Sequence, residues 1–572
     1  MKAFKDRLQA DMERLGLKEP TPMARTTANP VPPKLTVVAA EDDDGPPTDA
    51  DIKAVKDDVG ADKKGGAAAA TRALQDSLVF FIDQYGALRL EVHRSSGRTD
   101  CPHADSEDAA DYIRSKLQSA LGAGKTVTQG AVDAVIQGGR ANARAEQLRR
   151  QVHMRAANDG GEVVIDTANN SGERIRVSAS GYRVEAQGTT LFHRGSGIGV
   201  LPQPTQVTAQ QGYEILSKFA SAHGVRCGDI PVYAIVLTEY LRPGTPHPIL
   251  ELVGPAGARK STMARATVSI FDPTQNGEIP STGINEPDVM AAASNRYALH
   301  ADNVSKLSAD NQDLTCRIST GGELSARRLY SQRETESIHV QRPQVYTSIT
   351  SIFTRSDARS RTQTIALTPP RTGYKSESDV RREFKDGHPD LLGAVCALLS
   401  VGLGNLAAVK AQRHYSHRMA DFEQLGEAVH QALGQKAGWF GEILAARRQA
   451  DATVIAEGDL VLVGVLKVLD KWEADTKLRH ASKPTGRAIA RDGVCVWEDS
   501  GTRFTVATTT RWLQAVCQAM PFDQREQPPT SERALKHAID HRTPTLEALG
   551  LRVQAAKAND RNAIVFSRKV AQ

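Results

Sequence analysis

Paired cysteines, long apolar runs and a strong net charge are all missing from this sequence of 572 residues. Its six cysteines are scattered with no C-x-x-C pair, which excludes a disulfide framework and a cysteine zinc site. No apolar run approaches the length of a bilayer span, and the N-terminus lacks a signal-peptide core. We therefore expect a soluble cytoplasmic protein with no membrane partner. The net charge of +5 is small for this length, so any surface for nucleic acid must come from local patches.

The length of the chain predicts roughly two to four domains, because one core rarely extends through so many residues. Residues 1–75 combine proline, acidic and alanine-rich stretches with few large apolar residues, which is typical of a disordered tail or linker. Short alternating segments such as "GEVVIDT" and "RIRVSA" predict an α+β domain over 76–204. Residues 205–372 have the pattern of a nucleotide-binding core, and residues 373–485 form a helical region. Residues 486–572 contain a helix–turn–helix and a basic hairpin, which indicates a winged helix.

The stretch "PILELVGPAGARKSTMARATVSIF" (248–271) combines an apolar strand, a glycine-containing turn and a helix. Glycine lets backbone N–H groups point at an anion, and the N-terminus of a helix attracts that anion. The strict phosphate-loop pattern has glycine before the lysine, where this chain has Arg259. The context nevertheless favours a nucleotide site over a basic surface turn. The predicted nucleotide-binding residues are Gly254, Pro255, Ala256, Gly257, Ala258, Arg259, Lys260, Ser261 and Thr262.

A second apolar strand, "YALHA", ends at Asp302, and Asn303 follows it. In a strand–helix–strand nucleotide core, an acid at this place holds Mg²⁺. We expect Lys260 to bind the β- and γ-phosphates of ATP, and Ser261 and Asp302 to hold the metal. Asn303 stands where many ATPases have glutamate, so the group that orients the attacking water stays open.

The segment "STGGELSARRLYSQRETESIHV" places a Gly-Gly turn before several basic residues and one aromatic residue. An exposed hairpin of this kind suits contact with the phosphates of DNA and stacking on its bases. A solvated basic face is the alternative interpretation. The predicted DNA-contacting residues are Arg327, Arg328, Tyr330 and Arg333.

Taken together, these motifs resemble the replication ATPases of helicase superfamily three, in the phage and integrative-element branch related to poxvirus-type primase-helicases. That branch tends to show G-x-x-G-x-x-K-S-T, which "GPAGARKST" fits position by position. "CRISTGGELSARRLY" resembles the motif that leads into the family's DNA-contacting hairpin. The resemblance covers about residues 76–572. It implies an α/β fold in which an AAA+ P-loop core, a parallel central sheet with flanking helices, lies between an N-terminal α+β domain, post-ATPase helices and a C-terminal winged helix.

The resemblance also implies roles for residues beyond the loop. "HVQRPQVYTSI" looks like the strand that carries sensor 1, with Thr347 where the family usually has asparagine. "RSDARSR" resembles the arginine segment, which makes Arg361 the candidate arginine finger, with Arg355 and Arg359 as alternatives. Such a finger acts across a subunit boundary. The resemblance therefore implies a homo-oligomeric ring, expected to be a hexamer.

The function implied by the resemblance is that of an ATP-dependent DNA helicase or translocase. It would act in replication of a phage, plasmid or integrative element in the bacterial cytoplasm. ATP and Mg²⁺ are the implied cofactors, and single-stranded or forked DNA is the implied partner, with a separate primase or initiator as a further one. Two alternatives stay open: an ATP-binding, DNA-binding initiator or regulator with weak hydrolysis, and a defence ATPase of a mobile element.

Other polar residues receive structural interpretations. Asp83 and Asp166 each lack a second carboxylate two residues on, so we interpret them as turn-capping acids and predict no primase activity. Cys101 and His103 in "CPHAD" are interpreted as part of a loop. Basic residues of the C-terminal segment suit phosphate contacts, although a winged helix also binds proteins. They are Lys536, His537, Arg542, Arg561 and Arg568.

Overall fold

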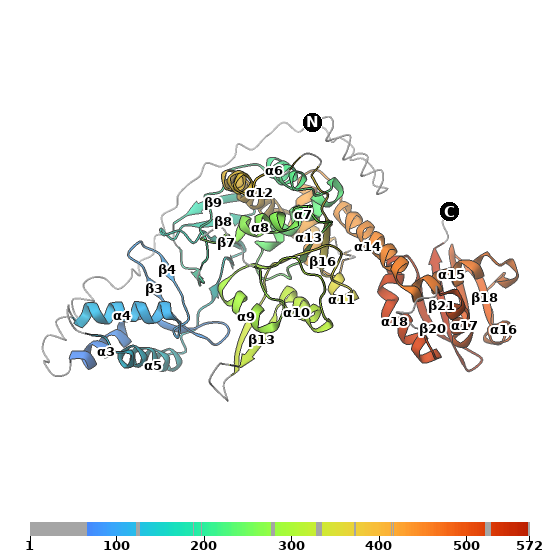
Figure 1. The fold of residues 1–572 in the computed structure, drawn as a ribbon, viewed down its shortest axis with the longest axis horizontal. Coiled ribbons are helices and arrows are strands. Elements are labelled where there is room, and N and C mark those ends of the chain that lie inside the picture. The colour runs from blue at the N-terminus through green and yellow to red at the C-terminus, as the bar shows by residue number, and fades with distance from the viewer. Residues whose placement is uncertain are drawn as a thin grey trace. The chain divides into compact units, whose positions relative to one another are not determined.

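The computed structural model divides into two compact units, Met1–Phe440 and Gly441–Gln572. It describes residues 66–121, 126–186, 188–195, 197–275, 281–327, 335–370, 373, 375–412, 415, 417–520 and 528–569. The predicted tail, residues 1–75, therefore lies almost wholly outside the described residues. Where it is described, the chain is an α/β structure with a parallel sheet and many helices, as the sequence predicts (Figure 1). The boundaries of the five predicted segments stay predictions.

The first part of the larger unit packs three helices on a short hairpin. Their buried apolar residues recur at helical spacing, as Ala109, Ile113 and Leu117 do, and form one core with Leu90 and Val135. The elements are α3 (Gly66–Ser77), β1 (Phe80–Ile82), β2 (Leu88–Leu90), β3 (Val92–His93), β4 (Thr99–Asp100), α4 (Glu107–Leu121) and α5 (Gln129–Ala145).

An antiparallel meander follows, and two of its strands, β7 (Glu162–Asp166) and β8 (Arg174–Ser178), coincide with the predicted segments "GEVVIDT" and "RIRVSA". In it, β6 (Ala156–Asp159), β7, β8 and β9 (Gly181–Glu185) pair in chain order. A separate parallel pair joins β5 (Val152–His153) to β10 (Leu191–Phe192). The predicted α+β character of this part is thus confirmed.

A four-stranded parallel sheet forms the centre of the larger unit. Its order is β12 (Leu299–Ala301), β15 (Gln344–Ser348), β11 (Ile249–Val253) and β16 (Thr362–Ala366). Most residues of these strands are buried, because helices cover the sheet. The accompanying elements are α6 (Ala209–Ala222), η1 (Cys227–Asp229), α7 (Ile230–Tyr240), α8 (Lys260–Phe271), α9 (Glu286–Asn295), α10 (Ala309–Thr320) and α11 (Ser356–Arg359).

A hairpin leaves this central part beside α9 and α10 (Figure 1). It consists of β13 (Gly322–Arg327) and β14 (Thr335–Val340), which pair antiparallel from Gly322 opposite Val340 to Arg327 opposite Thr335. The predicted hairpin therefore exists. Its base is anchored in the core, since Leu324 and Val340 are fully buried.

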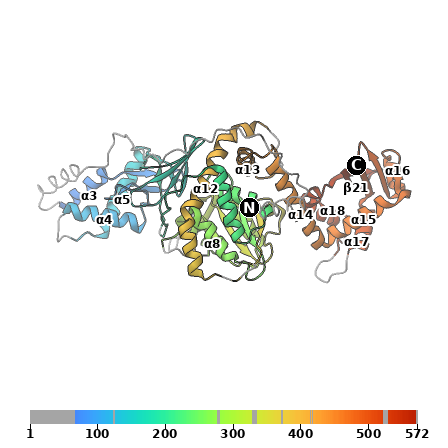
Figure 2. The same ribbon diagram turned by 90° about the horizontal axis from the view of Figure 1, so that it is seen from above.

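The long helix α12 (Glu377–Ala411) corrects one expectation from the sequence. It is long and apolar enough to span a bilayer by length and composition, with a mean hydropathy of 2.0 over its most apolar window. However, 61% of that window is buried inside the protein, where α12 packs beside α6, α8 and α13 (Ala420–Ala432) (Figure 2). The helix is thus explained as the core helix of this unit.

The second unit packs helices on a five-stranded sheet of order β17-β18-β19-β21-β20. Trp472, Trp512 and Phe566 form the centre of its core. The elements are α14 (Trp439–Gly458, which begins at the end of the first unit), α15 (Leu460–Ala474), η2 (Thr476–Leu478), β17 (Arg479–His480), α16 (Gly486–Asp492), β18 (Val494–Asp499), β19 (Thr502–Thr508), α17 (Thr509–Ala519), α18 (Glu532–Ala548), β20 (Arg552–Ala558) and β21 (Arg561–Lys569).

Helices α17 and α18 and the hairpin β20–β21 have the order that the sequence predicts. The hairpin does not stand alone, because β21 also pairs with β19 along its length. Two of the basic residues proposed for phosphate contact already hold carboxylates: Arg542 binds Asp459, and Arg568 binds Glu473. The winged-helix assignment stays a prediction.

A buried ion pair joins the meander to the central sheet. Arg155 before β6 and Asp272 after α8 are 0% and 1% exposed, and Arg155 Nη2 donates to Asp272 Oδ1 over 3.2 Å. The other carboxylate oxygen of Asp272 accepts the backbone N–H groups of Tyr297 and Ala298, each at 3.0 Å. Because each charge is buried, each depends on the other and on these hydrogen bonds for compensation.

Removing one partner of this pair tests its role. We expect Asp272→Ala to lower the free energy of unfolding of the larger unit by about 3–5 kcal/mol, because it leaves the Arg155 charge buried and unpaired. Asp105→Ala is the control, since its ion pair with Arg140 is half exposed and should contribute less than about 1 kcal/mol. Urea unfolding followed by circular dichroism measures both. Equal losses would contradict the structural role of Asp272.

Candidate nucleotide-binding site

The predicted loop lies at the carboxyl end of β11, between that strand and α8. The predicted helix follows the loop, and it begins at Lys260. Gly257 has φ +80°, and Arg259, directly before the helix, has φ 58°. These left-handed residues turn the chain sharply, so that the N-terminus of α8 meets the end of the strand. The glycine that the strict pattern places before the lysine is thus replaced by an arginine that adopts the same conformation.

Lys260 curls back over its own loop. Its Nζ donates hydrogen bonds to the carbonyl oxygens of Gly254 at 2.9 Å and Pro255 at 3.1 Å. Among the described residues it has no carboxylate partner. The ammonium charge therefore lies beside the N-terminus of α8 without being neutralised, which is the arrangement that binds a phosphate.

Three strand ends meet in one hydrogen-bond network. Ser261 Oγ on α8 donates to Asp302 Oδ1 at 2.8 Å, and Thr347 Oγ1 on β15 donates to the same oxygen. The backbone N–H of Asn303 in turn donates to Thr347 Oγ1 at 2.7 Å. Because β12, β15 and β11 are neighbours in a parallel sheet, residues at their carboxyl ends converge. The structure thus brings together Ser261, Asp302, Asn303 and Thr347, next to Lys260.

The charge of Asp302 is set by two opposing effects. Partial burial acts to raise the pKa of its carboxyl group, but the hydrogen bonds from Thr347 and Ser261 outweigh burial and lower that pKa below its ordinary value. Asp302 is therefore ionised at neutral pH. A carboxylate beside a serine hydroxyl is a set of hard oxygen ligands, which suits Mg²⁺ with its remaining positions filled by water.

The candidate arginine finger, Arg361, lies at the amino end of the parallel strands, whereas the loop lies at their carboxyl end. Arg361 directly precedes β16, whose first residue pairs with the first residue of β11, whereas the loop follows the last residue of β11. A strand of this length spans about 16 Å, so Arg361 is remote from the loop of its own chain. Arg361 Nη1 donates to the carbonyl oxygen of Asp357. Arg355 forms ion pairs with Asp313 and Asp357.

The predicted DNA-contacting residues belong to the tip of the β13–β14 hairpin. Arg327 is the last residue of β13. Arg328, Tyr330 and Arg333 lie outside the described residues. The hairpin on which they were placed is present, and their DNA-contacting role stays a prediction.

One buried acid was missed in the sequence. Glu251, in the middle of β11, is fully buried and accepts hydrogen bonds from Ser351 Oγ, Thr364 Oγ1 and the backbone N–H of Ile352. Burial raises its pKa, although these hydrogen bonds oppose the rise. The signal was a glutamate inside the otherwise apolar "PILELV". It braces β11 against β16 and against the loop that follows β15.

Of the two acids interpreted as turn-capping, Asp83 is confirmed in that role, whereas Asp166 ends β7 and holds an arginine. Asp83 Oδ1 accepts the backbone N–H groups of Tyr85 and Ala87, each at 2.9 Å. Asp166 pairs with Arg194, whose Nε lies 2.7 Å from Asp166 Oδ2. Neither carboxylate is arranged with a second one as a two-metal site would require.

Residues 216–444 match a family model. The family is described as the actinomycete integrative conjugative element replication protein. The matched segment contains the loop, Asp302, Thr347, Arg361 and the hairpin, and it covers less than half of the chain. It agrees with the integrative-element replication part of the resemblance drawn from the sequence. The chain has no match among curated proteins.

Two solved structures are weakly similar to this chain. One is the SCCmec type IV Cch active helicase, with 11% identity and a TM-score of 0.37 over 86% of this chain and 92% of that one. The other is the C-terminal region of NrS-1, with 11% identity and a TM-score of 0.35 over 88% of this chain and 98% of that one. At these TM-scores neither likeness bears on the fold or the function.

Gly254 offers a test of the loop geometry. A Cβ atom there would lie 2.7 Å from the carbonyl oxygen of Leu367 and 3.3 Å from Ala258 Cβ. We expect Gly254→Ala to lower the free energy of unfolding by about 1–3 kcal/mol, because the loop must move away from β16. Gly130→Ala in α5 meets nothing within 4 Å, and it should leave stability unchanged or raise it by up to about 1 kcal/mol. Urea unfolding decides, and a Gly254→Ala protein as stable as wild type would contradict the packing.

Proposed function

We propose that the larger unit binds and hydrolyses ATP with Mg²⁺. The observation that carries this proposal is the hydrogen bond from Ser261 to Asp302 beside Lys260. It places a hydroxyl, an ionised carboxylate and an ammonium group at the N-terminus of one helix. These are the groups that a Mg²⁺–triphosphate requires, and they come from two separate segments of the chain.

Each of these side chains has a distinct task. Lys260 exchanges its loop carbonyls for phosphate oxygens, which carry full negative charge and therefore bind it more strongly. Ser261 and Asp302 hold Mg²⁺, which when bound neutralises charge on the β- and γ-phosphates. The backbone N–H groups at the start of α8 add the partial positive charge of a helix N-terminus.

The position of Arg361 supports a homo-oligomer. Hydrolysis needs a cation that stabilises the charge developing in phosphoryl transfer. Because Arg361 lies at the opposite end of the parallel strands from its own Lys260, it serves this purpose only at the site of a neighbouring subunit. A closed ring gives every site one such neighbour, and by resemblance the ring is a hexamer.

We further propose that hydrolysis drives movement along DNA during replication of an integrative element. The family match over 216–444 supports the replication role. The β13–β14 hairpin supports contact with DNA, because it projects from the core on a buried base. Arg327, Arg328, Tyr330 and Arg333 would then bind the phosphates and bases at its tip.

One observation favours a second function, that of an ATP-binding initiator that hydrolyses weakly. Thr347 donates to Asp302 and accepts from Asn303, so the hydroxyl at the sensor position is already engaged at both ends. Asn303 is also not a base. An initiator would bind ATP and release almost no phosphate, with or without DNA, which separates it from the motor.

The first test compares ATP turnover in wild type and Lys260→Ala, with and without single-stranded DNA. We expect the wild type to hydrolyse ATP faster with DNA, and Lys260→Ala to lose at least about 100-fold in either condition. Lys218→Ala, an exposed lysine on α6, is the matched control and should behave as wild type. Turnover that survives in Lys260→Ala would exclude this site as the engine.

The second test asks whether Arg361 acts across a subunit boundary. We expect Arg361→Ala to lose about 1,000-fold or more in ATP turnover. Mixing it with inactive Lys260→Ala should restore part of the activity, because a mixed ring contains sites with an intact lysine and an intact neighbouring arginine. Arg355→Ala should stay active, since Arg355 already pairs with Asp313 and Asp357. A mixture that stays inactive would contradict action in trans.

A further inference from the structure

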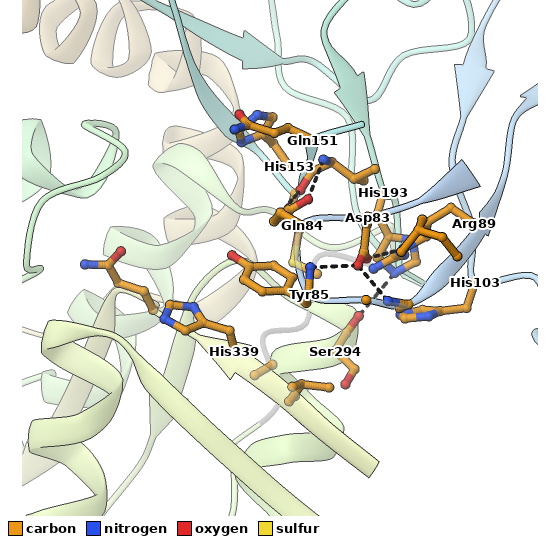
Figure 3. Close-up of a pocket in the computed structure, with 18 of the residues that line it drawn as sticks. Asp83, Gln84, Tyr85, Arg89, His103, Gln151, His153, His193, Ser294 and His339 are labelled. Atoms are coloured by element: carbon orange, nitrogen blue, oxygen red, sulfur yellow. Dashed lines mark hydrogen bonds and ion pairs between the residues drawn. The ribbon is translucent and has the colours of Figure 1, made fainter. Parts of the chain in front are cut away.

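A large polar cavity lies within the larger unit, beside strand β14 of the hairpin. It has a volume of about 1180 Å³, and its walls come from the β1–β2 turn, β5, the end of α9 and the segment around β14 (Figure 3). None of the predicted nucleotide-binding residues lines it. Small-molecule sites usually measure about 300–1,000 Å³, so this cavity has room for more than one nucleotide-sized group.

An exposed aromatic ring stands at the cavity on a rigid support. Tyr85 is 52% exposed, although it is a large ring. Its turn is held by Asp83, which is fully buried, accepts the N–H groups of Tyr85 and Ala87, and pairs with Arg89 at 2.8 Å. The ring is therefore presented in a fixed position, which lowers the entropy cost of stacking a partner on it.

Tyr85 already stacks on a ring from the hairpin. The ring centroids of Tyr85 and His339 lie 5.2 Å apart, and their planes differ by 7° (Figure 3). His339 belongs to β14, the strand that returns from the hairpin tip. Bases of a single strand stack on the faces of aromatic rings, and the 52% exposure of Tyr85 leaves ring surface outside this pair for a base.

The charge of the cavity is positive. The two acids that line it, Asp83 and Asp105, are each paired with an arginine, Arg89 and Arg140. Arg342 uses three of its five N–H donors on the backbone carbonyls of Arg296, Gln341 and Ala293, which leaves two for a ligand. Within the described ranges, neither Arg342 nor the exposed Arg144 has an ion-pair partner. Two cationic groups thus remain for an anionic ligand.

Neutral histidines supply further hydrogen-bonding groups. His193 and His247 line the cavity, and the Nδ1 atom of each is buried without a partner among the described residues. Burial lowers the pKa of each to about 3, so both rings are neutral at physiological pH. His193 Nε2 donates to the carbonyl oxygen of Ser294 at 3.2 Å, so its Nδ1 remains as an acceptor for an N–H group on the edge of a nucleobase.

We propose that this cavity binds a segment of single-stranded DNA, with a nucleobase stacked on Tyr85 and His339 and the phosphates at Arg144 and Arg342. The strand would pass along β14 into the cavity. The proposal extends the proposed function, because it gives DNA a contact apart from the nucleotide-binding loop, none of whose residues lines the cavity. Binding there requires neither ATP nor Lys260.

The test measures binding of a fluorescein-labelled oligo(dT) to the full chain by anisotropy, without nucleotide. We expect Tyr85→Ala to weaken binding about 10-fold, because base stacking is lost, and Tyr85→Phe to keep wild-type affinity. Arg144→Ala should weaken binding several-fold and flatten its salt dependence. Arg149→Ala, an exposed arginine five residues on that does not line the cavity, should have no effect.

The outcomes separate this proposal from the proposed function. If the wild type binds oligo(dT) and both Tyr85→Ala and Arg144→Ala bind equally well, the cavity is not a DNA site and the motor is untouched. If dTMP displaces the oligonucleotide at equimolar concentration, the cavity binds free nucleotides, which overturns the assignment. If the wild type binds no DNA without nucleotide, the cavity proposal falls, while ATP turnover of wild type against Lys260→Ala still decides the proposed function. Unchanged urea unfolding of each variant excludes misfolding as the cause of a loss.

Discussion

One carboxylate oxygen of Asp302 connects the elements on which the candidate site depends. It accepts hydrogen bonds from Ser261 on α8 and from Thr347 on β15, while Asp302 itself follows β12. Three segments far apart in the sequence are therefore fixed at one edge of the sheet. The same two bonds keep the carboxylate ionised against the effect of burial. Geometry and charge at the site thus have a common origin.

The buried pair of Arg155 and Asp272 plays a similar part for the architecture. Asp272 ends α8, the helix that begins with Lys260, and it holds the chain before β12 through Tyr297 and Ala298. Arg155 brings in the meander from the first part of the unit. A single carboxylate thereby sets where α8 ends, where β12 begins and where the N-terminal part attaches.

Much of this structure could be predicted from local patterns. The loop before Lys260, the strand that ends at Asp302 and the hairpin after Gly322 all follow from the alternation of apolar residues and glycine. The approach of Ser261 to Asp302 also follows, because parallel strands place their carboxyl ends at one edge. The patterns do not contain what depends on tertiary packing. In the sequence alone, the charged Glu251 conflicts with the apolar strand around it. Only the folded chain shows the hydroxyl groups that donate to its carboxylate.

The length of α12 shows the opposite limit. The apolar stretch of the sequence predicts a helix in this region. No local signal indicates that the helix continues through Pro389 or that it is long enough to span a bilayer. The cavity at Tyr85 was equally hidden. Its residues come from segments far apart in the sequence, and none forms a motif, since only the folded chain brings Tyr85 onto His339.

The continuity of the chain from β14 to β15 has a mechanical consequence. His339, which touches Tyr85, and Arg342, which lines the cavity, lie in the same short stretch as Thr347, which holds Asp302. Only the turn around Pro343 separates the two strands. A displacement of Thr347 would therefore be transmitted directly along this short stretch of chain to β14 and its hairpin.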